Sequence, residues 1–197
     1  MSPPDRNSTI FQRCDLTAAR PYSRREYAGK FAWRAIGIVL FRLSLPRAFR
    51  WRAIILRWFG ATIGAATLIH RTTRIYHPWL LTVGEWTNLG PDVVVYNLGP
   101  VRIGSHTVIS EGAWLCNGSH DYTLPNLPLL RPTSEIGSGV WIAMQAFIGP
   151  GVNIGDNCVV GARSVVMKDL PADIVAAGNP ARVLKLREMK QQPGAKQ

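Results

Sequence analysis

The chain is poor in cysteine and in acidic residues. Its 197 residues include three cysteines, Cys14, Cys116 and Cys158, and none belongs to a CxxC pair or lies beside histidines at zinc-ligand spacing. So few cysteines exclude a disulfide framework and favour a reducing, cytoplasmic setting. The sequence also lacks a Walker loop and a Rossmann glycine fingerprint, which argues against those two nucleotide-binding classes.

A long apolar run is also missing. The longest run near the start, residues 31–41, is interrupted by Arg34 and is shorter than the roughly 20 residues that span a bilayer. The opening MSPPDRNSTIFQRCD has no apolar segment of the kind found in signal peptides. We therefore expect a protein that is not integral to a membrane. Because 47% of the residues are hydrophobic and only 18% are charged, we expect a globular domain with a real core.

Positive charge is concentrated at the front of the chain. Residues 1–60 contain 12 Lys and Arg against 3 Asp and Glu, whereas residues 61–197 contain 11 against 9. We expect residues 1–28 to be a flexible segment and residues 29–60 to form a basic, amphipathic helical cap.

Two short helices are predicted within this cap. The first covers the apolar run from Lys30 to Leu43, and the second begins near Pro46 and ends at Gly60. At 100° per residue three arginines fall on one side of the second helix, namely Arg47, Arg50 and Arg57. The side chains then available for burial include Phe49, Ile54, Ile55 and Trp58.

From residue 63 onward an aliphatic residue recurs every six positions. The residues in this register are Ile63, Ile69, Ile75, Val83, Leu89, Val95, Ile103, Ile109, Leu115, Ile136, Ile142, Ile148, Ile154, Val160 and Val166. Glycine often follows the aliphatic residue, and the fifth position is usually small or β-branched. An α-helix cannot keep a period of six on one face. A triangular stack of short parallel strands can, with the aliphatic residue pointing to the axis.

The interruptions of the period all fall after a third hexapeptide. Two spacings are eight residues, and the third, from Leu115 to Ile136, is twenty-one. The extra residues therefore leave the prism along a single edge. The longest insertion, residues 121–135, contains three prolines, which disfavour continued strand pairing. His120 lies at its base.

The sequence is identified by these features as resembling the hexapeptide-repeat acyltransferases. The resemblance covers roughly residues 45–187 and includes the run IGSGVWIAMQAFIGPGVNIGDNCVVGARSVVMKDLP and the closing AAGNPARV. YHPWLLTVGEW, VVVYNLGPVRIGSHTVIS and LCNGSHDY are similar to the branch assigned to colanic acid and other exopolysaccharide biosynthesis. The resemblance implies an all-β, left-handed parallel β-helix over residues 61–183. The left hand is taken from the family, because six-residue spacing alone cannot fix it. We expect a C-terminal helix and tail over residues 184–197.

The resemblance implies acetyl-CoA-dependent O-acetylation of a sugar, without a metal. His120 matches the histidine that removes the proton of the acceptor hydroxyl, a task suited to an imidazole at physiological pH. Asp121, Glu111 or a backbone carbonyl could orient its ring. Asn97 and Asn117 occupy the same hexapeptide position as His77 and, with Asp121, are hypothesised to contact the sugar. The other histidines, His70, His77 and His106, are interpreted as structural or exposed.

The resemblance also implies a coenzyme A groove and a homotrimer with the groove between neighbouring prisms. The matching residues are Trp141, Ala143 and Met144 near the thioester and pantetheine, Ala162 beside the groove, and Lys168 and Arg182 near the phosphates. Backbone N–H groups of the turns can serve as oxyanion donors. Arg163 departs from the small residue common in the family at that point, so it adds a phosphate contact or narrows the groove.

Several alternatives remain open from sequence alone. The acceptor could be an amino sugar, another oligosaccharide or an antibiotic. A zinc carbonic anhydrase can use the same prism, but the histidine spacing and the C-terminal segment argue against it. The cap could cover the open end of the prism or lie on an anionic membrane surface, the latter as a peripheral protein of the inner membrane. Its arginines alternate with bulky apolar residues, which favours either role over nucleic-acid binding. A non-enzymatic scaffold also stays open as a remote alternative.

Overall fold

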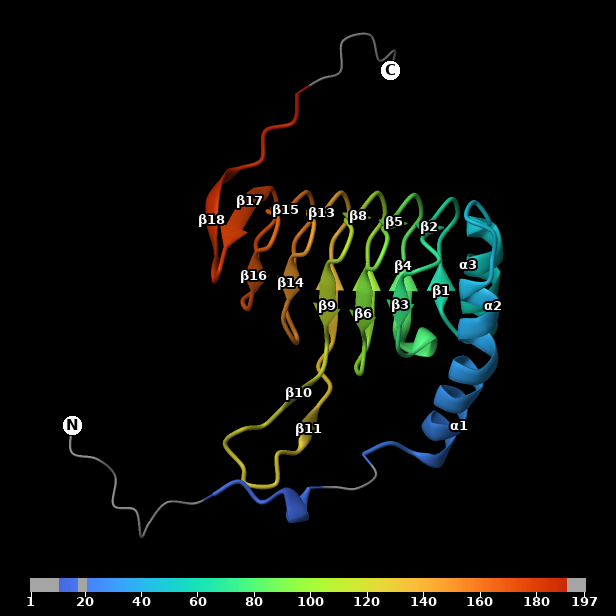
Figure 1. The fold of residues 1–197 in the computed structure, drawn as a ribbon. Helices are drawn as coiled ribbons and strands as arrows, with labels where there is room; N and C mark the ends of the chain where they lie inside the picture. The colour runs from blue at the N-terminus through green and yellow to red at the C-terminus, as the bar shows by residue number, and fades with distance from the viewer. Residues whose placement is uncertain (1–10, 18–20, 191–197) are drawn as a thin grey trace, which may run out of the picture.

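A stack of triangular coils forms the body of the protein in the computed structural model, which describes residues 11–17 and 21–190 (Figure 1). Each coil contributes one short strand to each of three parallel sheets. The first face contains β1 (Thr62–Ile63), β4 (Leu81–Val83), β7 (Val101–Ile103) and β12 (Ser134–Ile136). Ile154 and Leu170 continue this face as isolated bridges.

The other two faces consist of strands throughout. The second contains β2 (Leu68–Ile69), β5 (Asn88–Leu89), β8 (Val108–Ile109), β13 (Trp141–Ile142), β15 (Val159–Val160), β17 (Ile174–Gly178) and the antiparallel β18 (Ala181–Leu186). The third contains β3 (Arg74–Ile75), β6 (Val94–Tyr96), β9 (Trp114–Cys116), β14 (Phe147–Ile148) and β16 (Val165–Val166). A 3-10 turn, η4 (Pro78–Leu80), fills the first eight-residue spacing.

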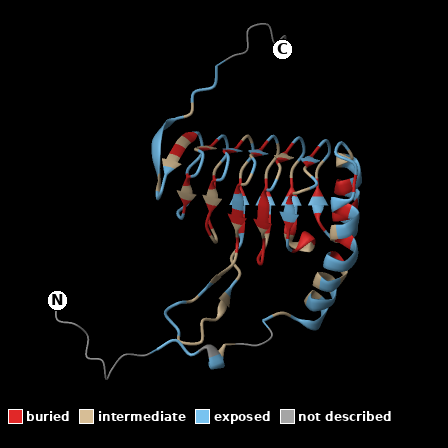
Figure 2. Ribbon diagram, viewed as in Figure 1, coloured by how far each residue is buried: buried red, intermediate tan, exposed pale blue. Residues whose placement is uncertain are grey.

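The strand register confirms the predicted six-residue period. Ile69 pairs with Leu89, and Leu89 pairs with Ile109. These three side chains are 0% exposed and stack along the axis, and buried residues, red in Figure 2, recur from coil to coil. A sixth, partial coil was not predicted. It begins at Leu170, only four residues after Val166, and continues through Ala176 in β17.

Threonines at the fifth position connect successive coils. The buried hydroxyl groups of Thr67, Thr87 and Thr107 donate to glycine carbonyl oxygens of the following coil at 2.7–2.8 Å. A residue at this corner must be small, and its hydroxyl also satisfies a buried acceptor. The preference seen in the sequence therefore has both a steric and a hydrogen-bonding cause.

Helices cover the end of the stack that begins with β1 (Figure 1). They are α1 (Arg24–Ala32), the π-helical turn η3 (Trp33–Gly37), α2 (Ile38–Arg42) and α3 (Phe49–Trp58). A capping box between Ser23 and Glu26 begins α1. Helical structure thus starts before the expected boundary at residue 29. In the part of the chain described, none of the helices has the length and apolar character needed to cross a membrane.

The cap satisfies the carbonyl groups that the first coil would otherwise leave unpaired. Arg57 Nη2 donates to the carbonyl oxygen of Ile63 at 2.6 Å, and Arg52 Nε donates to that of Ile69 at 2.6 Å. Trp33 Nε1 donates to the carbonyl oxygen of Ile75 at 2.8 Å. In later coils the equivalent carbonyls accept from the preceding coil's backbone. The basic segment therefore covers the open end of the prism.

Burial on α3 differs from the prediction. Arg52 is 0% exposed, whereas Ile54 and Trp58 are 38% and 65% exposed. The helix turns Arg52 inward because its guanidinium can donate to four acceptors at the open end of the prism, on Ser44, Leu45, Pro46 and Ile69. Only Ile55 of the residues predicted as available is fully buried.

The prediction of a C-terminal helix over residues 184–197 is wrong for the described part of that range. Residues 184–186 belong to β18, which pairs antiparallel with β17, and residues 187–190 have no regular structure. Residues 191–197 lie outside the described residues. A strand forms here instead of a helix because β17 leaves unpaired backbone groups at the sheet edge, and β18 can bond them.

The insertion after Leu115 forms a projecting hairpin (Figure 1), with β10 (Ser119–His120) antiparallel to β11 (Leu129–Leu130). The described part of the front segment lies beside it. Arg13 N donates to the carbonyl oxygen of Pro125 at 2.8 Å, and Thr17 Oγ1 donates to that of Asn126 at 3.1 Å. A short 3-10 turn, η2 (Cys14–Leu16), separates these contacts. Residues 11–17 therefore brace the hairpin, although residues 1–28 were expected to be a flexible segment.

Candidate active site

His120 lies at the end of β10, where the chain leaves the prism, and its side chain is exposed. Its Nδ1 atom is 2.6 Å from the carbonyl oxygen of Leu127. Since a carbonyl oxygen can only accept, Nδ1 carries the proton and donates it. In the neutral ring Nε2 is then unprotonated and available as a base.

Of the three groups considered for orienting the ring, the backbone carbonyl is the one in contact. The Asp121 carboxylate instead accepts hydrogen bonds from the backbone N–H and the hydroxyl of Thr123, and these bonds lower the pKa of Asp121. Glu111 lies at a different corner of the prism, after the second strand of its coil. Asp121 therefore stabilises the turn that follows His120, and Leu127 holds the ring.

Leu127 has a left-handed backbone conformation, with φ of 44°. This conformation is uncommon for a leucine and is held by the surrounding loop. The loop is tied down by Arg131, whose Nε donates to the carbonyl oxygen of Leu98 at 2.6 Å. Arg131 Nη2 also donates to Glu26 Oε1 at 2.6 Å, which joins the hairpin to α1.

Asn97 and Asn117 are placed inside the prism corner rather than on its surface. They are 0% and 1% exposed. Asn97 Oδ1 accepts from the backbone N–H of His77 at 3.0 Å, and its Nδ2 donates back to the His77 carbonyl at 2.6 Å. Asn117 Nδ2 donates to the carbonyl oxygen of Pro100 at 2.8 Å. The hypothesis of direct sugar contact does not fit this burial, and both amides lock the turns that lead to the hairpin.

Five of the six residues expected to hold coenzyme A gather at the corner between the second and third faces, which we call the second corner. Met144 and Ala162 occupy the same turn position in successive coils, linked by the 2.9 Å hydrogen bond from Arg163 N to the Met144 carbonyl. Both side chains are exposed, as is Trp141, whose Nε1 donates to Ser110 Oγ at 3.0 Å. Ala143 precedes Met144 and is 8% exposed.

Arg182 lies at the end of this column, because its β18 position pairs with Ala177 in β17. Lys168 does not join it. Lys168 follows the third strand of its coil and is exposed at the same corner as His120. We call that corner, between the third and first faces, the third corner. The third face separates His120 from the second corner, so a single chain does not bring the two parts of the site together.

Comparison with known proteins assigns this arrangement to a family. A family model described as bacterial transferase hexapeptide, six repeats, matches residues 133–168. The Escherichia coli K12 protein WcaF carries the provisional name of a colanic acid biosynthesis acetyltransferase. It is 44% identical over 155 residues, which cover 79% of this chain and 85% of WcaF. The chain belongs to the hexapeptide-repeat acetyltransferases.

Two further proteins place this hexapeptide-repeat acetyltransferase among its relatives. The galactoside O-acetyltransferase of Escherichia coli K12 is 30% identical over 152 residues, which cover 74% of this chain and 73% of the relative. A crystal structure of a Vibrio cholerae hexapeptide-repeat acetyltransferase complexed with acetyl-CoA has a TM-score of 0.78 at 24% identity. The match covers 86% of this chain and 93% of that one. The structural likeness confirms the predicted left-handed β-helix.

The remaining histidines of this acetyltransferase have structural surroundings. His77 is 1% exposed, and its Nδ1 donates to the carbonyl oxygen of Asn97 at 2.8 Å. Burial lowers the pKa of His77, which favours a neutral ring. His70 Nδ1 is 2.9 Å from Thr72 Oγ1, and His106 occupies a left-handed turn position with φ of 55°.

Sequence reasoning missed the groups that hold the hairpin in place. Leu127 acts through its carbonyl, so its residue type gives no signal. Glu26 and Arg131 lie 105 residues apart. The capping box that places Glu26 at the third helical position was recognisable in the sequence as SRRE, but its second contact to the hairpin was not.

Proposed function

We propose that this acetyltransferase moves the acetyl group of acetyl-CoA to a sugar hydroxyl in exopolysaccharide biosynthesis, with His120 as general base. The observation that carries the proposal is the 2.6 Å hydrogen bond from His120 Nδ1 to Leu127 O. It fixes the ring and leaves Nε2 as the proton acceptor. The names of WcaF and of the galactoside O-acetyltransferase support the sugar as substrate class.

The chemistry follows from the free Nε2 atom. His120 takes the proton of the acceptor hydroxyl as its oxygen attacks the thioester carbonyl. A C–O bond forms, the C–S bond breaks, and the imidazolium returns a proton to the departing thiolate. A backbone N–H of a coil turn is proposed to stabilise the oxyanion. General-base catalysis of this kind contributes about 10²- to 10⁴-fold.

Coenzyme A is proposed to lie along the second corner, with Trp141 and Met144 near the thioester and Ala143 and Ala162 beside the groove. Arg182 is suited to a coenzyme phosphate because its exposed guanidinium lies at the end of the column. Lys168, at the third corner, is proposed to reach a phosphate from the neighbouring prism. This assignment requires a second chain, because the third face separates His120 from the second corner.

We propose a homotrimer in which the third corner of one chain faces the second corner of the next. Co-expression of His120→Ala with Met144→Arg tests the shared site. Each variant alone is expected to be nearly inactive, whereas mixed trimers should regain part of the activity because one interface keeps both intact halves. Activity no higher than in the separate variants would place both halves in one chain. Sedimentation equilibrium gives the number of chains independently.

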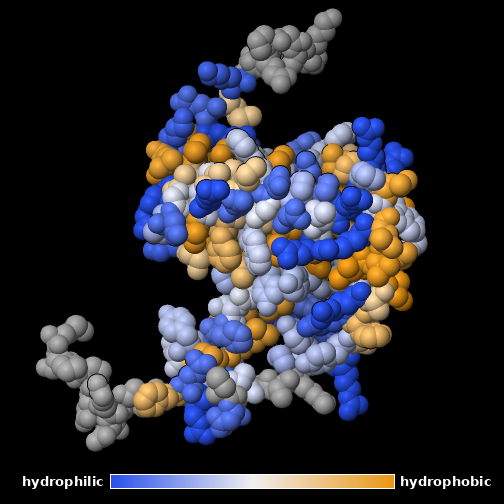
Figure 3. Space-filling view, in the orientation of Figure 1, coloured by the Kyte–Doolittle hydropathy of each residue, from blue (hydrophilic) through white to orange (hydrophobic). Residues whose placement is uncertain are grey.

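The cap is further proposed to touch an anionic membrane, at the cytoplasmic surface. Large apolar side chains are exposed on it, including Phe31 at 75%, Leu43 at 80% and Leu45 at 77%. Figure 3 shows hydrophobic residues over this end of the molecule, interspersed with basic ones. Such a surface suits shallow insertion between acidic headgroups. Co-sedimentation with vesicles containing anionic lipid should fall when Leu43→Ser is introduced, and salt-independent or absent binding would reject this role.

Turnover of acetyl-CoA with a panel of glycans, followed by thiol release, tests the catalytic assignment. We expect His120→Ala to lower kcat/KM by about 10²- to 10⁴-fold. His106→Asn is the matched control, since asparagine also tolerates the left-handed turn that His106 occupies. Undiminished turnover in His120→Ala would move the base to another residue.

A further inference from the structure

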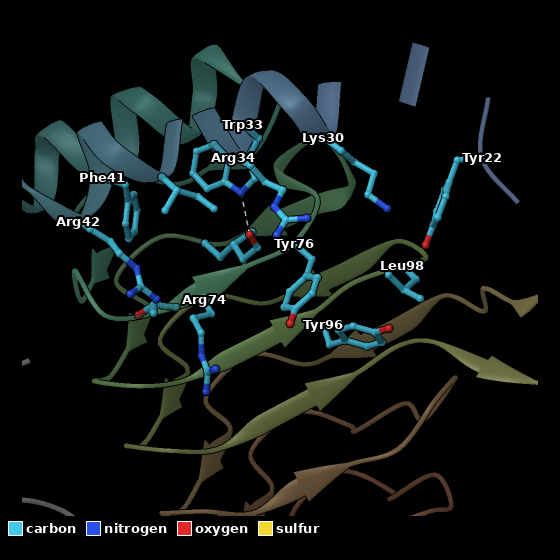
Figure 4. A pocket seen from close by; sticks show the side chains of 13 residues that line it. Tyr22, Lys30, Trp33, Arg34, Phe41, Arg42, Arg74, Tyr76, Tyr96 and Leu98 are labelled. Atoms are coloured by element: carbon cyan, nitrogen blue, oxygen red, sulfur yellow. Dashed lines mark hydrogen bonds between the residues drawn. The ribbon is translucent and has the colours of Figure 1, made fainter. Parts of the chain in front are cut away.

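A cavity of about 320 Å³ lies between the cap helices and the third face of the first two coils (Figure 4). Lys30, Arg34 and Arg42 reach it from the helices, and Arg74 reaches it from β3. Tyr76 and Tyr96 line the opposite wall. Its volume falls at the small end of the usual range for ligand sites.

Positive charge predominates in this cavity, where Glu26 acts on Lys30 from one turn away in α1. No Asp or Glu is among the described residues that line it. The ion pairs found within residues 11–17 and 21–190 join Arg13 with Asp15, Arg102 with Glu135, and Arg131 with Glu26, and so leave these four cations without a carboxylate partner. A concave site lined by one sign of charge raises the local concentration of the opposite ion.

Lys30 shows the effect of this arrangement on a single group. Its Nζ atom lies 3.7 Å from the centre of the Tyr22 ring, in partial burial. Burial and the charges of Arg131 and Arg34 lower the pKa of Lys30. An anion bound between the helix and the third face would raise the pKa of Lys30 again and relieve the repulsion among the cations.

The aromatic wall suits a sugar ring. Tyr76 and Tyr96 meet edge to face with their ring centres 4.7 Å apart, on adjacent strands of the third face. Arg74 lies 5.7 Å from the ring centre of Trp114, which keeps the guanidinium on the same face. Apolar ring surface beside fixed charges is the usual composition of a site that binds a polar ligand in one orientation.

The cavity is close to the catalytic histidine. Leu98 and Tyr96 line it and also surround Gly118, where an added Cβ would lie 2.5 Å from Leu98 Cδ1 and 3.2 Å from Tyr96 Cε1. Gly118 precedes His120 by two residues, and two residues of extended chain span at most about 7 Å. A saccharide held in the cavity can therefore extend toward His120.

We propose that this cavity binds an acidic group, a phosphate or a carboxylate, on the acceptor glycan, so that the enzyme selects anionic acceptors. The inference rests on the proposed acetyl transfer to a sugar. Arg34, Arg42 and Arg74 provide forked donors that match either group in two-point contacts, and Lys30 adds a point charge. A neutral saccharide would leave these four cations unpaired and gain only the aromatic wall.

Acceptor pairs that differ in charge test the proposal. Glucose is compared with two acidic acceptors, glucose 1-phosphate and glucuronate. The KM of each acid should be at least about tenfold lower than the KM of glucose, which corresponds to about 1.4 kcal/mol. Arg34→Gln combined with Arg74→Gln should raise the KM of the acids about tenfold or more and leave that of glucose unchanged. Arg47→Gln combined with Arg50→Gln, two exposed cap arginines outside the cavity, is the matched control. Equal KM values for neutral and acidic acceptors, or an equal effect of the variants on both, would overturn the inference.

Calorimetric binding of glucose 1-phosphate separates this inference from the proposed function. If no acceptor is acetylated, the proposed function fails, yet binding that is lost in Arg34→Gln with Arg74→Gln still supports the anion site. Anionic vesicles provide the second arm. Binding to vesicles that depends on Arg34 and Arg74, with no binding of the soluble phosphate, would assign these arginines to lipid headgroups and refute the acceptor site.

Discussion

Glu26 and Arg131 join the first cap helix to the hairpin that carries His120, through a 2.6 Å contact across 105 residues of chain. The same carboxylate accepts from the backbone N–H of Ser23 at 2.9 Å and so completes the helix cap. One acidic side chain therefore serves both the start of α1 and the base of the hairpin that carries His120.

The pH dependence of stability should reveal this contact. Hydrogen bonds from the Ser23 backbone, then from Arg131 and Ser23 side chains, lower the pKa of Glu26 from 4.5 to about 2. A depressed pKa gives stability that is fully present above 4.5 and is lost as the pH falls toward about 2. We expect unfolding between pH 5 and pH 2, followed by denaturant titration, to show a smaller pH slope in Glu26→Gln. Identical slopes in the two proteins would show that Glu26 is not held this way.

Removing the buried guanidinium should uncap the prism. Arg52→Met keeps the apolar stem but removes the guanidinium donors from the carbonyls of Pro46 and Ile69, whereas the Leu45 carbonyl still accepts from the N–H of Ala48. We expect a loss of about 3 kcal/mol, since each buried unsatisfied group costs about 1–3 kcal/mol. For a domain of this size that lowers Tm by roughly 6–12 °C. Arg50→Met, on the exposed side of the same helix, should stay within about 0.5 kcal/mol; similar losses in both would argue against the capping role.

Asn117 distinguishes a structural amide from a sugar contact. Its Oδ1 accepts from Ser134 Oγ at 3.0 Å, while its Nδ2 holds the carbonyl oxygen of Pro100. We expect Asn117→Ala to destabilise the protein by about 2 kcal/mol through unpaired buried groups. The KM for the acceptor should change less than twofold in the folded variant at low temperature. A large rise in that KM without loss of stability would restore the hypothesis of direct sugar contact.

Gly118 tests whether the base of the hairpin must lie close to the prism. A Cβ there would approach Leu98 Cδ1 to 2.5 Å, so Gly118→Ala must displace Leu98 or the chain that leads to His120. We expect kcat to fall about tenfold with a stability loss of about 1–3 kcal/mol, as for other overpacked sites. Gly90→Ala, whose Cβ would lie 3.1 Å from Ile109 O at another corner, should lose stability but keep kcat. Full activity in Gly118→Ala would show that the hairpin tolerates the shift.

The body of the fold was predictable because its code is local. An aliphatic residue at every sixth position fixes which side chain faces the axis, and the pairing of Ile69 with Leu89 follows directly. The partial sixth coil was not predicted because Leu170 follows Val166 by four residues and so breaks the six-residue period. The strand Ala181–Leu186 was not predicted because its partner, the edge strand β17, is available only after the coils have stacked.

The site was predictable only in part, for a similar reason. The motif around His120 and the turn residues Met144 and Ala162 are local patterns. No pattern marks Arg52 as buried or Leu127 as the partner of His120, since both depend on groups that meet only in the folded chain. The cavity cations come from the helices and from β3, and their placement around one cavity is likewise a tertiary property.

The stack of coils is covered at its first end and partly covered at its last. Three side-chain donors occupy the carbonyls of the first coil, and β18 reverses direction over the last parallel strand of the second face. A bare coil end would be a template on which another copy could add strands indefinitely. With the first end covered and the second face of the last end extended by an antiparallel strand, fibre growth along the axis is disfavoured. Sideways association through the flat faces and the corners between them is favoured instead.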